Sequence, residues 1–125
     1  MTRTLHPTPT FQVRLALHRD VVIGPGKADL LEAIERTGSI SAAGRALGMS
    51  YKKAWQLIET MNGYFIEALV ETHAGGSKHG GAKLTDTGRQ VIARYRALER
   101  RLSGEYDDDA RALLALLAPT PNADA

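Results

Sequence analysis

The sequence contains no cysteine, which excludes both a disulfide framework and a zinc site built on thiolates. It also lacks long apolar runs, and none approaches the ~20 residues that a helix needs to span a bilayer. Residues 1–17 lack the apolar segment of roughly 7–15 residues that marks a signal peptide. We therefore expect a cytoplasmic protein, and its 125 residues suffice for one domain with a modest core.

A strong net charge is missing too, since the formal net charge is only +2. Its distribution is more informative. Residues 36–103 hold 11 Lys and Arg against 5 Asp and Glu, whereas residues 104–125 hold 1 Arg and 5 acids. Basic charge concentrated on the middle of a chain is typical of a phosphate-binding surface, although an unevenly charged solvated surface is the alternative.

Residues 39–62 have the pattern of two short helices joined by a tight turn. Ser41 is expected to cap a helix over residues 42–47, with Ser39 as the alternative cap. Gly48 should close that helix, because glycine adopts the left-handed conformation at little cost. Ser50 should cap the next helix, which continues to Met61 or Asn62. The sequence therefore predicts a helix-turn-helix.

The second helix of this motif begins with a polar turn. Apolar residues of the two helices fall on a core-facing side: Leu47 from the first, and Ala54, Leu57, Ile58 and Met61 from the second. The N-terminal end of such a helix enters the major groove of DNA, where lysine contacts guanine or phosphate and glutamine pairs with adenine. For Trp55 we favour packing over DNA contact. The candidate DNA-binding residues of this motif are Ser41, Ser50, Tyr51, Lys52, Lys53 and Gln56.

A glycine-rich basic loop over residues 74–82 lies between two predicted strands, residues 69–73 and 83–85. Its glycines allow close backbone approach to another surface, and its cations suit phosphates or a minor groove, so we interpret the hairpin as a wing. An ordinary mobile loop is the alternative. A metal site at His73 and His79 is not expected, because no acid or cysteine is near them. The candidate contact residues of the wing are Gly76, Ser77, Lys78, His79 and Lys83.

The rest of the chain should brace this unit. Gly24-Pro25-Gly26 and Asn62-Gly63 are interpreted as turns, and Thr85 or Thr87 is expected to cap a long last helix with a stripe of Val91, Ile92, Tyr95, Leu98 and Leu102. The other predicted elements are a disordered arm over residues 1–10, a half-buried strand over 11–17, a short strand over 21–23, a helix over 27–37 and a helix over 110–117.

No enzyme is expected. The sequence has no nucleophile spaced with a histidine and an acid as in a catalytic site, and the acids Glu32, Glu35, Glu59 and Glu67 fall on predicted helix surfaces or beside turns.

These motifs resemble the N-terminal domain of ModE, the molybdate-responsive transcriptional regulator. The specific parts are Ser50-Tyr51-Lys52-x-Ala54-Trp55, Met61-Asn62, the glycine run and Leu84-Thr85-x-x-Gly88, and the match runs from about Phe11 to Arg101. The alanine-rich first helix of the motif is also similar to LysR-type regulators, whose recognition helix differs.

The resemblance implies a winged helix-turn-helix homodimer that binds palindromic operators in double-stranded DNA, and control of molybdate-uptake or molybdoenzyme genes. We expect repression. Full-length members carry a C-terminal molybdate-binding region of small β-barrels, whereas residues after Leu102 are acidic and alanine-rich without a strand pattern. We therefore expect no bound cofactor, with molybdate sensed by a separate subunit or not at all.

The expected fold class is α+β, mainly α: a winged helix-turn-helix over residues 11–103 with an N-terminal strand, a hairpin wing and a long C-terminal dimerisation helix. Residues 104–125 are expected to form a short acidic helix and tail. Two alternative functions stay open. One is a protein-interaction module with residual DNA binding, and the other is a small molybdate-binding protein that uses the glycine-rich loop or Gly24-Pro25-Gly26-Lys27.

Overall fold

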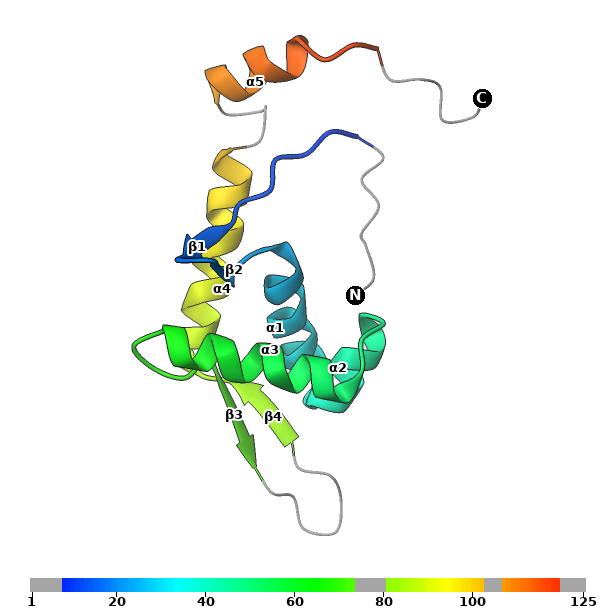
Figure 1. Ribbon diagram of the computed structural model, residues 1–125, viewed down its shortest axis with the longest axis vertical. Coiled ribbons are helices and arrows are strands. Elements are labelled where there is room, and N and C mark those ends of the chain that lie inside the picture. The colour runs from blue at the N-terminus through cyan, green and yellow to red at the C-terminus, as the bar shows by residue number, and fades with distance from the viewer. Residues whose placement is uncertain (1–7, 74–80, 103–106, 120–125) are drawn as a thin grey trace.

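The computed structural model describes residues 8–73, 81–102 and 107–119, which form five helices and two antiparallel hairpins (Figure 1). This architecture confirms the expected mainly helical α+β class. In chain order the elements are β1 (Leu15–Leu17), β2 (Asp20–Ile23), α1 (Pro25–Thr37), α2 (Ile40–Ala46), α3 (Tyr51–Tyr64), β3 (Val70–His73), β4 (Gly81–Leu84), α4 (Asp86–Arg101) and α5 (Asp108–Ala115).

Helix α1 lies at the centre of the core, with α2, α4 and β4 packed against it. Its apolar side chains are fully excluded from solvent, and their burial stabilises the fold. These residues are Ala28, Leu30, Leu31, Ala33 and Ile34. None of the described helices is long and apolar enough to cross a membrane.

Helix α1 starts two residues earlier than predicted. Pro25 occupies its first turn, where proline is favourable because its fixed φ suits a helix and its missing N–H is not needed. The interpretation of Gly24-Pro25-Gly26 as a turn was therefore wrong. The predicted end of the helix at residue 37 is confirmed, because the next residue, Gly38, has φ 77° and donates its N–H to the Ile34 carbonyl.

The N-terminal hairpin is shorter than predicted and projects from the body. Strand β1 covers only Leu15–Leu17, and it pairs with β2 across the two-residue turn His18-Arg19. The expected buried face was wrong for Leu15 and Leu17, which are 53% and 48% exposed. Alternation indicates a strand, but it does not show whether another element covers that strand.

Helix α4 is capped by Thr85, whose Oγ1 accepts from the Gly88 N–H at 3.0 Å. The alternative cap, Thr87, instead donates to Glu67 Oε1 at 2.6 Å. The predicted stripe on α4 is only partly internal: Val91 and Ile92 are half-buried and Tyr95 is buried, but Leu98 and Leu102 are exposed. The last helix is α5, which begins two residues before its predicted start and is capped by Asp107.

Arg96 joins α4 to α1 by a cluster of charges. Its guanidinium contacts Asp29 at 2.7 Å, Glu32 at 2.6 Å and Glu99 at 2.8 Å. Hydrogen bonds to Glu32, then to Glu99 and Asp29, raise the pKa of Arg96 against the opposing effect of burial. The two helices are therefore held by both apolar packing and charge-assisted hydrogen bonds.

Tyr95 anchors the chain before β1 to α4, since its Oη donates to the Val13 carbonyl at 2.6 Å and the residue is only 3% exposed. Burial is the first cause that raises the pKa of Tyr95 to about 12. The unfolded value is about 10, so folding favours the neutral phenol. The contribution of the neutral Tyr95 phenol to the free energy of unfolding is therefore complete below about pH 10 and is lost as the pH rises to about 12.

Tyr95→Phe should lower the free energy of unfolding by about 1 kcal/mol at pH 7, because one hydrogen bond is lost. It should also reduce the loss of stability between about pH 10 and 12. Urea unfolding followed by circular dichroism across this pH range measures both effects. An identical pH profile in the variant would contradict the assignment to Tyr95.

Candidate nucleic-acid interface

Helices α2 and α3 form the predicted helix-turn-helix. Gly44 permits their close approach, because a Cβ there would lie 3.2 Å from the Met49 carbonyl oxygen and 3.4 Å from the Ala54 side chain. Gly48, in the turn, has φ 71°, as expected of a glycine after a helix end. The prediction that Gly48 closes the first helix of the motif is confirmed.

The caps of the two helices decide between the predicted alternatives. Ser39, not Ser41, caps α2, and its Oγ accepts from the Ala42 N–H at 2.8 Å. Ser41 lies within the helix, where its hydroxyl accepts from Arg45 Nη1 at 2.9 Å. The first choice was wrong because either serine fits the capping preference, and the helix starts two residues earlier than predicted. Ser50 caps α3 as predicted and accepts from the Lys53 N–H at 3.1 Å.

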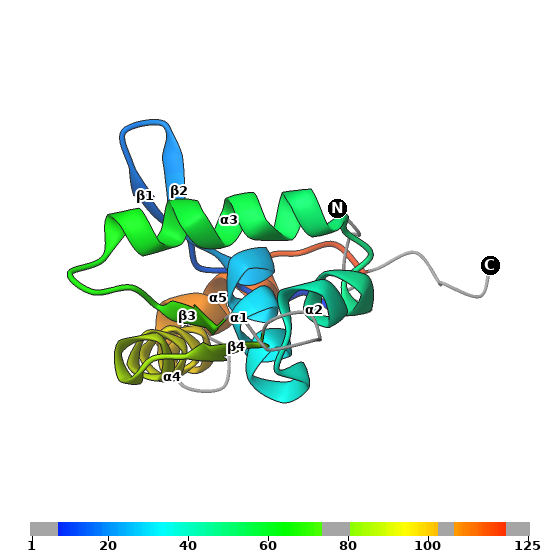
Figure 2. The same ribbon diagram turned by 90° about the horizontal axis from the view of Figure 1, so that it is seen from below.

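Helix α3 has a buried side and a broad exposed side (Figure 2). Ala54, Ile58 and Met61 are buried, and Leu57 is half-buried and packed against the core. The remaining residues of the first two turns face solvent. The structure thus places together on exposed surface the predicted contact residues Ser50, Tyr51, Lys52, Lys53 and Gln56.

Trp55 lies outside the core. The residue is 42% exposed, beside Tyr51 at 57%. Our preference for packing was therefore wrong as far as the core of this chain is concerned. The neighbouring Ala54 turns inward and Trp55, one residue on, turns toward the solvent, which sequence alone did not resolve. Two aromatic rings on the exposed side of α3 add apolar surface suited to contact with thymine methyl groups or sugars.

Asn62 connects the end of α3 to the second hairpin. Its Oδ1 accepts from the backbone N–H groups of Leu69 and Val70 at 2.8 and 3.2 Å, and its Nδ2 donates to the Val70 carbonyl at 3.3 Å. The predicted turn at Asn62-Gly63 was wrong, because both residues belong to α3. The asparagine uses its side chain to bind a distant strand instead of its own turn.

Strands β3 and β4 form the predicted wing, which extends away from the body below α3 in Figure 1. Their register pairs Glu71 with Lys83 and His73 with Gly81. Lys83 is exposed on β4 as expected. The other predicted wing residues, Gly76, Ser77, Lys78 and His79, lie outside the described residues, so their contacts remain a prediction.

Sequence reasoning missed one cation near α3. The Lys27 ammonium donates to the Val21 carbonyl, and its pKa is lowered first by burial and further by the charge of Lys53, against the opposing effect of Asp20. The Lys27 ammonium is thus close enough to Lys53 to feel its charge, although Lys27 belongs to α1. No spacing rule links the two positions; only the fold brings the first turn of α1 toward α3.

The pattern of the bacterial regulatory helix-turn-helix proteins of the lysR family matches residues 27–89, which include most of α1, all of α2 and α3, and the wing. The chain belongs to this family. Membership identifies the α2–α3 unit as the helix-turn-helix of a bacterial regulator and supports the prediction that the chain is not an enzyme.

Individual relatives make the family assignment more specific. The chain is 48% identical over 99 residues to the molybdenum transport protein ModE of Azotobacter vinelandii, covering 78% of this chain and 37% of that protein. It is 47% identical over 77 residues to the molybdenum-pterin-binding protein MopB of Rhodobacter capsulatus, covering 62% and 28%. The DNA-binding transcriptional dual regulator ModE of Escherichia coli K12 is 38% identical over 108 residues, covering 83% and 41%.

These relatives confirm the resemblance to the N-terminal domain of ModE-type regulators. The chain spans about two fifths or less of the length of these curated relatives. The similarity therefore concerns the helix-turn-helix part, and the activities of the complete relatives can only be proposed for this chain.

Proposed function

We propose that this chain is a ModE-type transcriptional regulator that binds double-stranded DNA in a sequence-specific manner. Helix α3 lies in the major groove, with Ser50 to Lys53 and Gln56 toward bases and phosphates, and the β3–β4 wing contacts the backbone. One observation carries the proposal: the polar first turns of α3 are exposed on a helix held rigidly against α2, inside the segment that matches the family.

The proposed binding unit is a homodimer on a palindromic operator. A single module of this size covers less DNA than tight specific binding needs, and a two-fold dimer doubles the contact. Half-sites are then expected about one helical turn apart or at multiples of that spacing. The exposed Leu15, Leu17, Leu98 and Leu102 supply apolar surface for a partner subunit.

The proposed target genes are those of molybdate transport or molybdoenzymes, with repression as the expected direction, in the cytoplasm where such operators lie. Support comes from the names of the relatives, two of which are ModE proteins and one a molybdenum-pterin-binding protein. The direction of regulation is tested with operators selected from a random DNA pool, each placed upstream of a reporter gene. Reporter output that rises with expression of the chain would contradict repression.

Selection of bound DNA from a random pool tests the proposed function most directly. We expect enrichment of a palindrome whose half-sites have the spacing of a dimer. Failure of any sequence to enrich, with correctly folded protein, would contradict sequence-specific binding.

The same selection with molybdate present tests the prediction that this chain binds no cofactor. An unchanged palindrome and an unchanged affinity are expected. A change in either would contradict that prediction while leaving DNA binding intact.

A further inference from the structure

The two hairpins of the structure lie on opposite flanks of α3. On one flank, Asn62 bonds to β3 and so directs that side of the helix toward the β3–β4 wing. On the other flank, the Tyr64 hydroxyl donates to Asp20 of β2, two residues further along the helix. Since successive helix positions differ by about 100°, Asn62 and Tyr64 lie about 200° apart around the axis. The exposed side of α3 therefore has a hairpin on each side.

The β1–β2 hairpin is firmly fixed at its base. Val22 and Ile23 are 5% and 4% exposed, and the backbone carbonyl of Val21 accepts from Lys27. Asp20 is tied to α3 through Tyr64. A hairpin held by both α1 and α3 keeps a defined direction relative to the exposed side of α3, and Figure 2 shows it extending past that helix.

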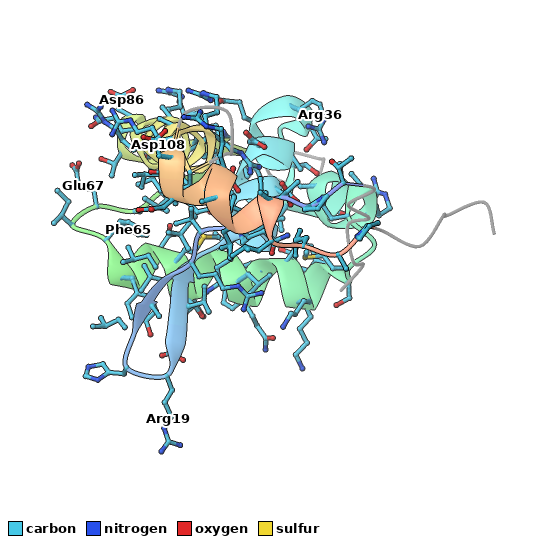
Figure 3. The ribbon with its side chains drawn as sticks, turned by 90° about the horizontal axis from the view of Figure 1, so that it is seen from above. Arg19, Arg36, Phe65, Glu67, Asp86 and Asp108 are labelled. Carbon is cyan, nitrogen blue, oxygen red and sulfur yellow. The ribbon has the colours of Figure 1, made fainter. Side chains whose placement is uncertain are left out.

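The tip of this hairpin presents a cation. Figure 3 shows Arg19 at the end of the hairpin, directed away from the body. Within residues 8–73, 81–102 and 107–119 no hydrogen bond or ion pair to Arg19 is found. Beside it, His18 has φ 57°, a conformation that glycine usually supplies in two-residue hairpin turns. A defined turn thus holds an exposed guanidinium beyond the surface of α3.

We propose that the β1–β2 hairpin is a second wing, in which Arg19 binds a phosphate of the DNA strand that borders the major groove opposite the β3–β4 wing. The inference rests on the proposed function. A major groove about 12 Å wide admits one helix and is bordered by two backbones. An element that projects beyond the inserted helix on one flank approaches the backbone on that side. Arginine suits this contact because its planar guanidinium bonds phosphate in a bidentate manner.

The neighbouring charges favour the same occupant. Lys53 lies on the same side of α3 as Tyr64, because their separation along the helix brings them to within about 20° around its axis. The Lys27 ammonium of α1 donates to Val21 of β2 on this flank and is close enough to Lys53 to feel its charge. Asp20, the acid beside Arg19, is the first residue of β2 and accepts a hydrogen bond from the Tyr64 hydroxyl. With Arg19, Lys27 and Lys53 against the single carboxylate of Asp20, this flank carries net positive charge, which suits a polyanion better than an acidic or neutral protein surface.

Arg19→Ala tests the proposal by titration of the selected operator over a series of salt concentrations. Affinity should fall about three- to tenfold, and the slope of log K against log salt should decrease by about 0.9 per subunit, as expected for one lost phosphate contact. Arg19→Lys should retain most of the slope. Arg36→Ala is the matched control, because Arg36 is an exposed arginine on the opposite side of the molecule (Figure 3), and it should leave both quantities unchanged.

Ethylation interference locates the contact. In the wild-type complex, modified phosphates should interfere on both strands that border the groove, and Arg19→Ala should abolish interference on one border only. If wild-type protein binds the operator while Arg19→Ala retains full affinity, slope and interference, the second wing is contradicted and the proposed function stands. If wild-type protein enriches no operator, the proposed function itself fails, and the second wing with it.

Discussion

The Lys52→Ala/Lys53→Ala double variant should bind the operator about 100-fold more weakly than the wild type. Both ammonium groups are exposed in the first turn of α3, and the proposed dimer presents four of them. Each lysine lost from a phosphate lowers the salt slope by about 0.9, and each lost base contact costs about 1–3 kcal/mol of discrimination. Gel-shift titrations at several salt concentrations measure affinity and slope together.

A matched control removes the same charge elsewhere. Arg36→Ala/Arg111→Ala deletes two exposed cations that lie on α1 and α5 rather than on α3. Its affinity should stay near the wild-type value. Equal losses in the two double variants would show that net charge, and not the position of the lysines on α3, determines binding.

Gly88→Ala should destabilise the protein by about 3 kcal/mol or more, a large part of the stability of a small domain. Gly88 lies in the first turn of α4, where a Cβ would stand 2.2 Å from the carbonyl oxygen of Leu69. That oxygen also accepts from the Thr85 N–H at 2.9 Å, so the backbone cannot withdraw without losing the junction between β3 and α4. Urea unfolding followed by circular dichroism measures the change.

Gly63→Ala supplies the opposite control. Gly63 is helical and exposed, and no atom lies within 4 Å of the position its Cβ would take. Alanine there should stabilise the protein by about 0.5 kcal/mol, since it restricts the unfolded chain and favours helix. A destabilisation of similar size in both variants would contradict the steric explanation for Gly88.

The helix-turn-helix could be predicted because its signals are local. Ser50 and Gly48 each have a strong preference for one position at a helix end, and the structure places them there. Local signals fail where two residues satisfy the same preference, as Ser39 and Ser41 do. They fail again where a residue serves a distant partner, as Asn62 does through Leu69 and Val70.

The contact surface was predictable in part for the same reason. The exposed first turn of α3 follows from helical spacing alone. The exposure of Leu15 and Trp55 depends on which elements cover them, and the proximity of Lys27 to Lys53 depends on how α1 packs. Such facts are properties of tertiary arrangement, and a single sequence contains no short-range pattern for them.

The three hydrogen bonds of Asn62 have a consequence for how the proposed complex selects its DNA. They lock α3 and the β3–β4 wing into one unit with a fixed angle between them. In the proposed complex, such a unit keeps a fixed distance between the helix in the major groove and the wing at the neighbouring backbone. Operators whose natural groove width matches that span bind without deformation, whereas stiff sequences of another width pay an elastic cost. Base pairs that no side chain touches should therefore contribute to the choice of operator by the proposed complex.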